Sequence, residues 1–235
     1  MKLIKFFTLF SFCFVPCAFP SVIVTYDAPG VQTTNVAGTS VYSFNTIAPN
    51  STVTPATAFA TFSKLYVMNA NEYGGAMGGR YGVVGDPTGS ANVQSTTVTF
   101  ARPASYLGFW WSAADPHNLF TLYSGSTALL TMSNRTLNKA LGSCGGANAY
   151  CGNPVNGQDP GELFAYVNIW GKNGTNFTSA RFQQLEDQGG FEFDNVAVPD
   201  APIGGAPSIP EPGTWGFAGL GLVLLLGLQR TLRRA

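Results

Sequence analysis

Apolar and polar positions alternate in short runs through most of this chain, which is the pattern of β-strands with one buried face. The clearest runs are residues 22–26, 93–100, 106–111, 119–123, 127–132, 163–170, 181–185 and 190–198. Weaker strand candidates are residues 42–44 and 58–62, and one short helix is predicted around residues 136–141. The pattern therefore predicts an all-β fold with hardly any helix.

Two of these runs carry further detail. Residues 106–111 are nearly all apolar, as expected for a strand that is buried on both faces. Residues 119–123 and 127–132 flank Ser124-Gly125-Ser126, so we expect a hairpin in which Gly125 occupies the turn position with positive φ. Short strands at regular spacing, separated by turn residues, favour a β-sandwich over residues 21–198.

The two ends of the chain have a different character. Lys2 and Lys5 precede an apolar stretch at 6–15 and small or turn-forming residues at 16–21, which is the layout of a secretory signal peptide. We expect residues 1–20 to be removed by cleavage. Cys17 raises the alternative of a lipoprotein, but Pro16 stands where a lipidation site requires a small residue.

The C-terminal end has three parts in order. Residues 199–209 are rich in Pro and Gly and predict an extended linker. Pro210-Glu211-Pro212 follows, and then an apolar run at 215–228, which is short beside the roughly 20 residues that a membrane span requires. Flanking residues make a thin span plausible. The basic residues Arg230, Arg233 and Arg234 close the chain and favour a cytoplasmic end.

This tail, residues 210–235, resembles the PEP-CTERM sorting signal of Gram-negative bacteria: a Pro-Glu-Pro motif, a hydrophobic helix and an arginine-rich end. The resemblance implies that an exosortase, a membrane enzyme, recognises the tail and cuts near Pro210-Glu211-Pro212. It also implies a membrane-held intermediate and a final place in the cell envelope, at the surface or in the extracellular matrix. The alternative is an ordinary C-terminal membrane anchor.

The body is similar to exosortase-dependent surface proteins whose domains look like carbohydrate-binding jelly rolls. The resemblance rests on Tyr73-Gly74-Gly75, the aromatic run 106–115, the hairpin 120–127 and the closing run 191–198. It implies a jelly-roll-like sandwich and a surface location. The group has no established chemistry to carry over.

Composition narrows the classes of partner. The chain has 12 Lys and Arg against 12 Asp and Glu, so no basic patch for nucleic acid is expected. Once the signal peptide is removed, Cys144 and Cys151 remain, on either side of a Gly-containing loop. In an exported chain they predict a disulfide, since two thiols without a nearby His fall short of a zinc site.

Catalysis is not expected. His117 lies in a turn, Asp115 could orient it, and no motif nominates a nucleophile for a Ser-His-Asp mechanism. Two carboxylates would serve a glycosidase. The mid-domain acids show no persuasive pairing by spacing; they are Glu72, Asp86, Asp115, Asp159, Glu162, Glu186, Asp187, Glu192 and Asp194.

The closing strand admits two interpretations. By the two-residue period, Glu192 and Asp194 share one face of the strand while Phe191 and Phe193 share the other. We therefore expect the phenylalanines to face the core and the acids to face solvent. The alternative is a structural Ca²⁺, which jelly-roll carbohydrate-binding domains often hold near the first and last strands. Its candidate ligands are Asp27, Asp194 and Asn195.

Sugar binding is the last hypothesis. Aromatic rings can stack on pyranose faces, and Trp110, Trp111 and Trp170 are the candidates. Adjacent residues of a strand face opposite sides, so we expect one of Trp110 and Trp111 in the core and the other at a surface. The sequence thus predicts a non-catalytic, exported surface or matrix protein associated with exopolysaccharide. The alternatives are a lectin-like module and a secreted hydrolase.

Overall fold

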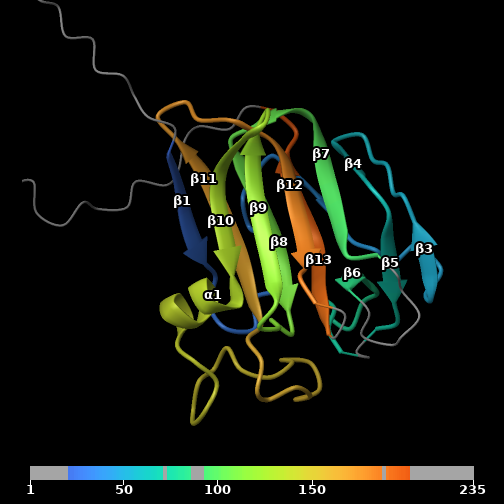
Figure 1. Ribbon diagram of the computed structural model, residues 1–235, viewed down its shortest axis with the longest axis vertical. Coiled ribbons are helices and arrows are strands. Elements are labelled where there is room, and N and C mark those ends of the chain that lie inside the picture. The colour runs from blue at the N-terminus through green and yellow to red at the C-terminus, as the bar shows by residue number, and fades with distance from the viewer. Residues whose placement is uncertain (1–20, 71–72, 86–92, 187–188, 202–235) are drawn as a thin grey trace, which may run out of the picture.

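The computed structural model describes residues 21–70, 73–85, 93–186 and 189–201, and it shows an all-β sandwich of two antiparallel sheets (Figure 1). The predicted signal peptide (1–20), the sorting signal (210–235) and residues 202–209 of the linker lie outside the described residues. Within the described part of the chain, no helix is both long and apolar enough to span a bilayer.

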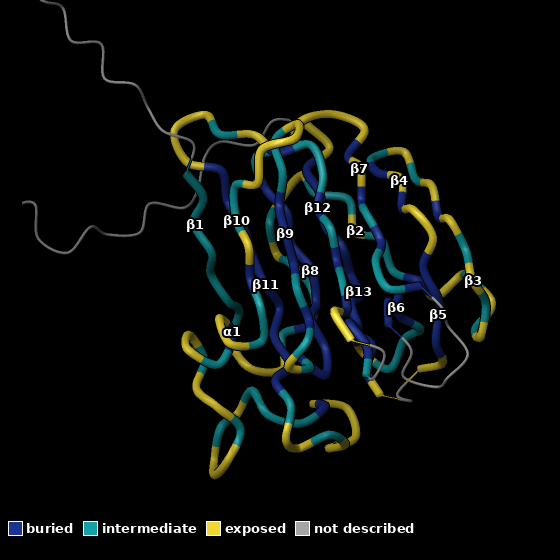
Figure 2. The backbone as a smooth tube through the Cα atoms, in the orientation of Figure 1, coloured by how far each residue is buried: buried dark blue, intermediate teal, exposed yellow. Residues whose placement is uncertain are grey.

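The larger sheet has eight strands, seven of them in the order β1, β11, β8, β13, β6, β5, β3, while β2 also pairs with β13. Their bounds are β1 Ser21–Tyr26, β2 Thr39–Tyr42, β3 Ser51–Val53, β5 Leu65–Met68, β6 Tyr81–Gly85, β8 Tyr106–Ser112, β11 Ala165–Lys172 and β13 Gly190–Pro199. β8, β11 and β13 are buried along almost their whole length (Figure 2).

The smaller sheet has five strands in the order β10, β9, β12, β7, β4. Their bounds are β4 Ala60–Phe62, β7 Ser95–Ala104, β9 Asn118–Ser124, β10 Thr127–Ser133 and β12 Phe177–Gln184. From β6 to β13 the chain alternates between the two sheets except at the β9–β10 hairpin. The short helix α1, Asn134–Leu141, follows β10.

Every strand predicted from the pattern overlaps an observed one, and the predicted helix lies within α1. Tyr106–Ser112 is buried on both faces as expected, and Gly125 has φ of +57° in the β9–β10 hairpin. Three strands were not predicted: β3, β5 and β6. β3 has three residues, β5 is buried throughout and does not alternate, and β6 carries two glycines.

Aromatic side chains fill the space between the sheets. Phe182 of β12 stacks on Phe193 of β13 with ring centroids 4.2 Å apart, and Trp111 of β8 stacks on Phe191 at 4.5 Å. Stacked and edge-to-face contacts of this kind add specific geometry to the apolar area that they bury. The inward face of the closing strand is therefore the apolar one, as predicted.

The chain enters and leaves the sandwich at the same end. β1, β11, β8 and β13 are successive neighbours, each antiparallel to the next, so β13 runs opposite to β1. Ser21, the first residue of β1, thus lies at the end of the sheet where β13 finishes at Pro199. The opposite end carries α1 and the loop at 142–164 (Figure 1). We call this opposite end the loop end.

Candidate functional site: an acidic pocket at the loop end

Residues 73–79 cover part of the outer face of the larger sheet, at β8 and β13. The indole Nε1 of Trp110 donates to the carbonyl of Gly75 at 3.2 Å, and the amide of Ala76 donates to Asp194 Oδ2 at 3.0 Å. Trp110 is consequently 0% exposed, as is Trp111 on the other face. The expectation that one of the two lies at the surface is wrong, because a loop forms a second layer over the sheet.

The same layer corrects the prediction for the closing strand. Glu192 and Asp194 do share the face opposite Phe191 and Phe193, but that face does not meet solvent: Glu192 is 2% exposed and Asp194 is 0% exposed. A period of two residues assigns side chains to faces, and it does not say whether a loop covers the outer face.

Four carboxylates gather around one pocket of about 260 Å³ at the loop end. Asp115 follows β8, Asp159 and Glu162 lie on the loop that precedes β11, and Glu192 lies near the start of β13. We call this the acidic pocket. The residues that line it are Tyr73, Ala113, Asp115, Asp159, Glu162, Gly189, Gly190 and Glu192. Spacing in the sequence had not paired these acids, since they come from three separate segments.

Hydrogen bonds hold the wall of the pocket in place. Asp115 Oδ2 accepts the amide of Gly190 at 2.8 Å. Beneath it, buried Asn118 accepts the Trp111 indole N–H at 3.0 Å and donates to the carbonyl of Gly190 at 2.7 Å. Gly190 is thus fixed from both sides, and the start of β13 is fixed with it. This network places Glu192 on the pocket wall.

Burial raises the pKa of all four acids, and repulsion from neighbouring acids adds to this rise for Asp115, Glu162 and Glu192. Burial, followed by the negative charges of Asp115 and Asp159, raises the pKa of Glu162 to about 7. Burial and the charges of Asp115 and Glu162 raise the pKa of Glu192 well above its ordinary value. Burial also raises the pKa of Asp115, which the Gly190 amide opposes, and that of Asp159. Each carboxylate is easier to protonate than an exposed one.

No Lys or Arg of the described residues forms an ion pair with these acids, although the nearby His117 opposes the rise in the pKa of Asp115. The one ion pair there joins His117 Nδ1 to Glu186 Oε1 at 3.2 Å, outside the pocket lining. Glu192 Oε2 and Asp159 Oδ2 are buried without a hydrogen-bond partner. Unpartnered buried oxygens are uncommon in folded proteins, and a site that binds a donor ligand is one explanation for them.

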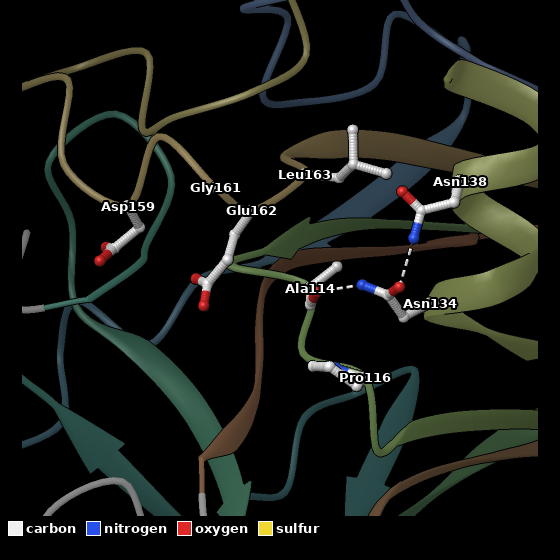
Figure 3. A pocket seen from close by; sticks show the side chains of 8 residues that line it. All are labelled: Ala114, Pro116, Asn134, Asn138, Asp159, Gly161, Glu162 and Leu163. Carbon is white, nitrogen blue, oxygen red and sulfur yellow. Dashed lines mark hydrogen bonds between the residues drawn. The ribbon is translucent and has the colours of Figure 1, made fainter. Parts of the chain in front are cut away.

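Figure 3 shows a neighbouring depression that shares Asp159 and Glu162 with the acidic pocket. The carboxylates of these two residues lie on one side of it, while Asn134 and Asn138 of α1 lie on the other. Asn134 donates to the carbonyl of Ala114 and accepts from Asn138, so the two amides bind protein groups. The carboxylates of Asp159 and Glu162, and not the two amides, are therefore the groups of this depression that a ligand would contact.

A second depression, of about 340 Å³, lies on the larger sheet away from the acidic pocket. The residues that line it are Thr25, Asp27, Thr34, Asn35, Val36, Asn168 and Trp170. Trp170 is 7% exposed and packs on Tyr106 with ring centroids 4.5 Å apart. It is the one predicted sugar-binding tryptophan that lines a depression among those described.

The predicted calcium ligands have other neighbours. Asp194 Oδ1 and Oδ2 accept backbone amides of Asn195 and Ala76, and the Asn195 side chain donates to the carbonyl of Gln32. Asp27 lines the depression beside Trp170. Across the described residues, no three His, Cys, Asp or Glu side chains are arranged to hold a metal ion.

Cys144 and Cys151 form a disulfide in the structure, as predicted. The bond closes the tip of the loop that follows α1, at the same end of the sandwich as the acidic pocket. The neighbouring Tyr150 hydroxyl donates to the carbonyl of Asp27 at 2.9 Å. The disulfide-bonded loop is thus tied to the end of β1.

No model of a known protein family matches this chain, and neither a curated protein nor a solved structure matches it.

Proposed function

We propose that this chain is a non-catalytic, exported surface or matrix protein of a Gram-negative cell envelope, sorted through its C-terminal signal by an exosortase-type enzyme. The observation that carries the proposal is the placement of the domain ends. β1 begins at Ser21 and β13 finishes at Pro199, at the same end of the sandwich. If the C-terminal tail is held in the membrane, the loop end of the domain points away from the membrane, because the tail leaves from the opposite end.

The strand order supports a jelly-roll class for the domain. One sheet contains the order β6, β13, β8, β11, and the other contains β7, β12, β9, β10. Eight strands that alternate between two sheets, with one hairpin in the middle, follow the double Greek key of a jelly roll. Domains of this type present loops at one end of a rigid scaffold, where recognition concentrates.

The disulfide agrees with export, because such bonds suit an oxidising compartment outside the cytoplasm. In this account the domain acts by display and association with exopolysaccharide, and the residues from 200 to 209, after the end of β13, separate it from the membrane segment.

The test is the intact mass and membrane fractionation of the endogenous protein, with and without replacement of Pro210-Glu211-Pro212 by alanines. We expect a mature species that ends near residue 210 and is lost in the variant. A species that keeps Arg233 and Arg234 in the membrane, identical in both strains, would contradict sorting and leave a simple anchored domain.

The depression beside Trp170 favours glycan binding as a second candidate function. It combines an aromatic edge with carboxylate, amide and hydroxyl groups, which are the groups that bind sugar hydroxyls. Asn35 is exposed there, so Asn35→Ala should leave the fold intact. On a glycan array, binding that Asn35→Ala reduces and the exposed-site variant Met77→Ala retains would support a lectin; binding unaffected by Asn35→Ala would oppose this site.

A further inference from the structure

The acidic pocket gathers four carboxyl groups with no Lys or Arg partner in the described residues. The four groups line a volume of about 260 Å³. Glu192 is 2% exposed, lines the pocket, and leaves its Oε2 without a hydrogen-bond partner. A buried carboxyl oxygen of this kind is neutralised either by its own proton or by a ligand, and a cationic ligand supplies both N–H donors and a positive charge for the whole cluster.

We propose that the acidic pocket binds a small ligand that carries primary ammonium groups. An ammonium offers three N–H donors and one positive charge, which match several separate carboxylate acceptors. Tyr73, 39% exposed, lines the same pocket and offers an aromatic ring for a cation–π contact. The volume lies just below the usual range for ligand pockets, so the ligand is small.

The arrangement of the acids favours an ammonium over a metal ion. Calcium draws six to eight oxygens to about 2.3 to 2.6 Å from one point. No three acidic, imidazole or thiol groups of the described residues converge in that way. An ammonium instead donates to separate acceptors at about 2.7 to 2.9 Å, so it does not require the carboxylates of the three segments to converge on one point.

The pocket is also placed for access. Asp115, Glu162 and Glu192 lie at the ends of β8, β11 and β13 that are opposite Ser21 and Pro199. A ligand therefore meets the domain on the side away from both chain ends. Binding at the acidic pocket requires only the folded domain and does not depend on the sorting signal.

Isothermal titration calorimetry of the full chain in mild detergent, at pH 8, tests the proposal. The probes are 1,4-diaminobutane, its neutral counterpart 1,4-butanediol, and CaCl₂. We expect the diamine to bind at least about tenfold more tightly than the diol, because only the diamine supplies charge. Glu192→Gln and Glu162→Gln should each weaken the diamine about tenfold or more, since each replaces a carboxyl group, which can carry a negative charge, by a neutral amide.

The matched control is Asp200→Asn, which removes an exposed acid at the opposite end of the domain and should bind as wild type. Equal binding of diamine and diol, binding of Ca²⁺ without the diamine, or equal weakening by Asp200→Asn would overturn the proposal. If Glu192→Gln fails to fold, Tyr73→Ala takes its place: it should weaken the diamine and leave any diol binding unchanged, and unchanged diamine affinity would count against the site.

Discussion

At the scale of single residues, the main feature is a set of buried acids on a strand whose pattern predicted them at the surface. The pattern placed Glu192 and Asp194 on the correct shared face, because side chains of a strand alternate. It did not predict their burial, because residues 73–79 cover that face through contacts distant in sequence, such as Ala76 to Asp194. The acidic pocket was missed for the same reason.

These acids predict how stability depends on pH. In the folded protein the pKa of Glu162 rises from 4.5 to about 7 and that of Asp194 from 3.8 to about 7, chiefly by burial. Between about pH 4 and 7 the folded state therefore binds more protons than the unfolded state, and the free energy of unfolding falls as pH rises.

Thermal unfolding followed by circular dichroism should thus give a lower Tm at pH 8 than at pH 5, by about 3 °C or more. Glu162→Gln should flatten the profile, since glutamine does not titrate, while the exposed-acid variant Asp200→Asn should keep it. A Tm that is constant or rises between pH 5 and 8 would show that these carboxylates are not buried as described.

The tryptophans predict a second residue-scale result. Trp111→Ala removes a ring that stacks on Phe191 and an N–H bound to Asn118, and we expect a loss of about 3 to 5 kcal/mol in the free energy of unfolding. Urea unfolding measures it. Met77→Ala, at a side chain 66% exposed, should change the value by no more than about 0.5 kcal/mol. Comparable values for both variants would place Trp111 at the surface.

At the scale of elements, most of the strand pattern was predictable. Strands with clear alternation, or with a long apolar run such as 106–111, were found because burial selects their side chains. β5 and β6 were missed because both are short and buried on both faces, and glycines interrupt β6. The bulge in β13, where Asn195 has φ of +45° and the register with β8 shifts, left no local signal.

The disulfide gives an element-scale prediction. Cys144 and Cys151 close a short loop, and in the loop-entropy model this constrains the unfolded chain by about 2 to 3 kcal/mol. Urea unfolding with and without dithiothreitol should differ by that amount. The double variant Cys144→Ser, Cys151→Ser should unfold like the reduced protein and be insensitive to dithiothreitol; an unchanged midpoint on reduction would mean that the bond does not form in solution.

At the scale of the whole molecule, the fold class was predictable and the arrangement of its ends was not. Composition, short strands and turns indicated a sandwich, whereas the shared end for Ser21 and Pro199 follows from the pairing of β1, β11, β8 and β13. Because both chain ends lie at one end of the domain, we propose that the domain stands at the cell surface with its loop end outward.

Antibody labelling of intact cells tests that claim most directly, with an epitope inserted after Gly157 in the exposed part of the loop at 142–164. We predict that the antibody labels intact cells when the protein carries the wild-type sorting signal. When Pro210-Glu211-Pro212 is replaced by alanines, we expect labelling only after permeabilisation. An epitope that is hidden in intact wild-type cells and revealed only by permeabilisation would contradict display at the surface.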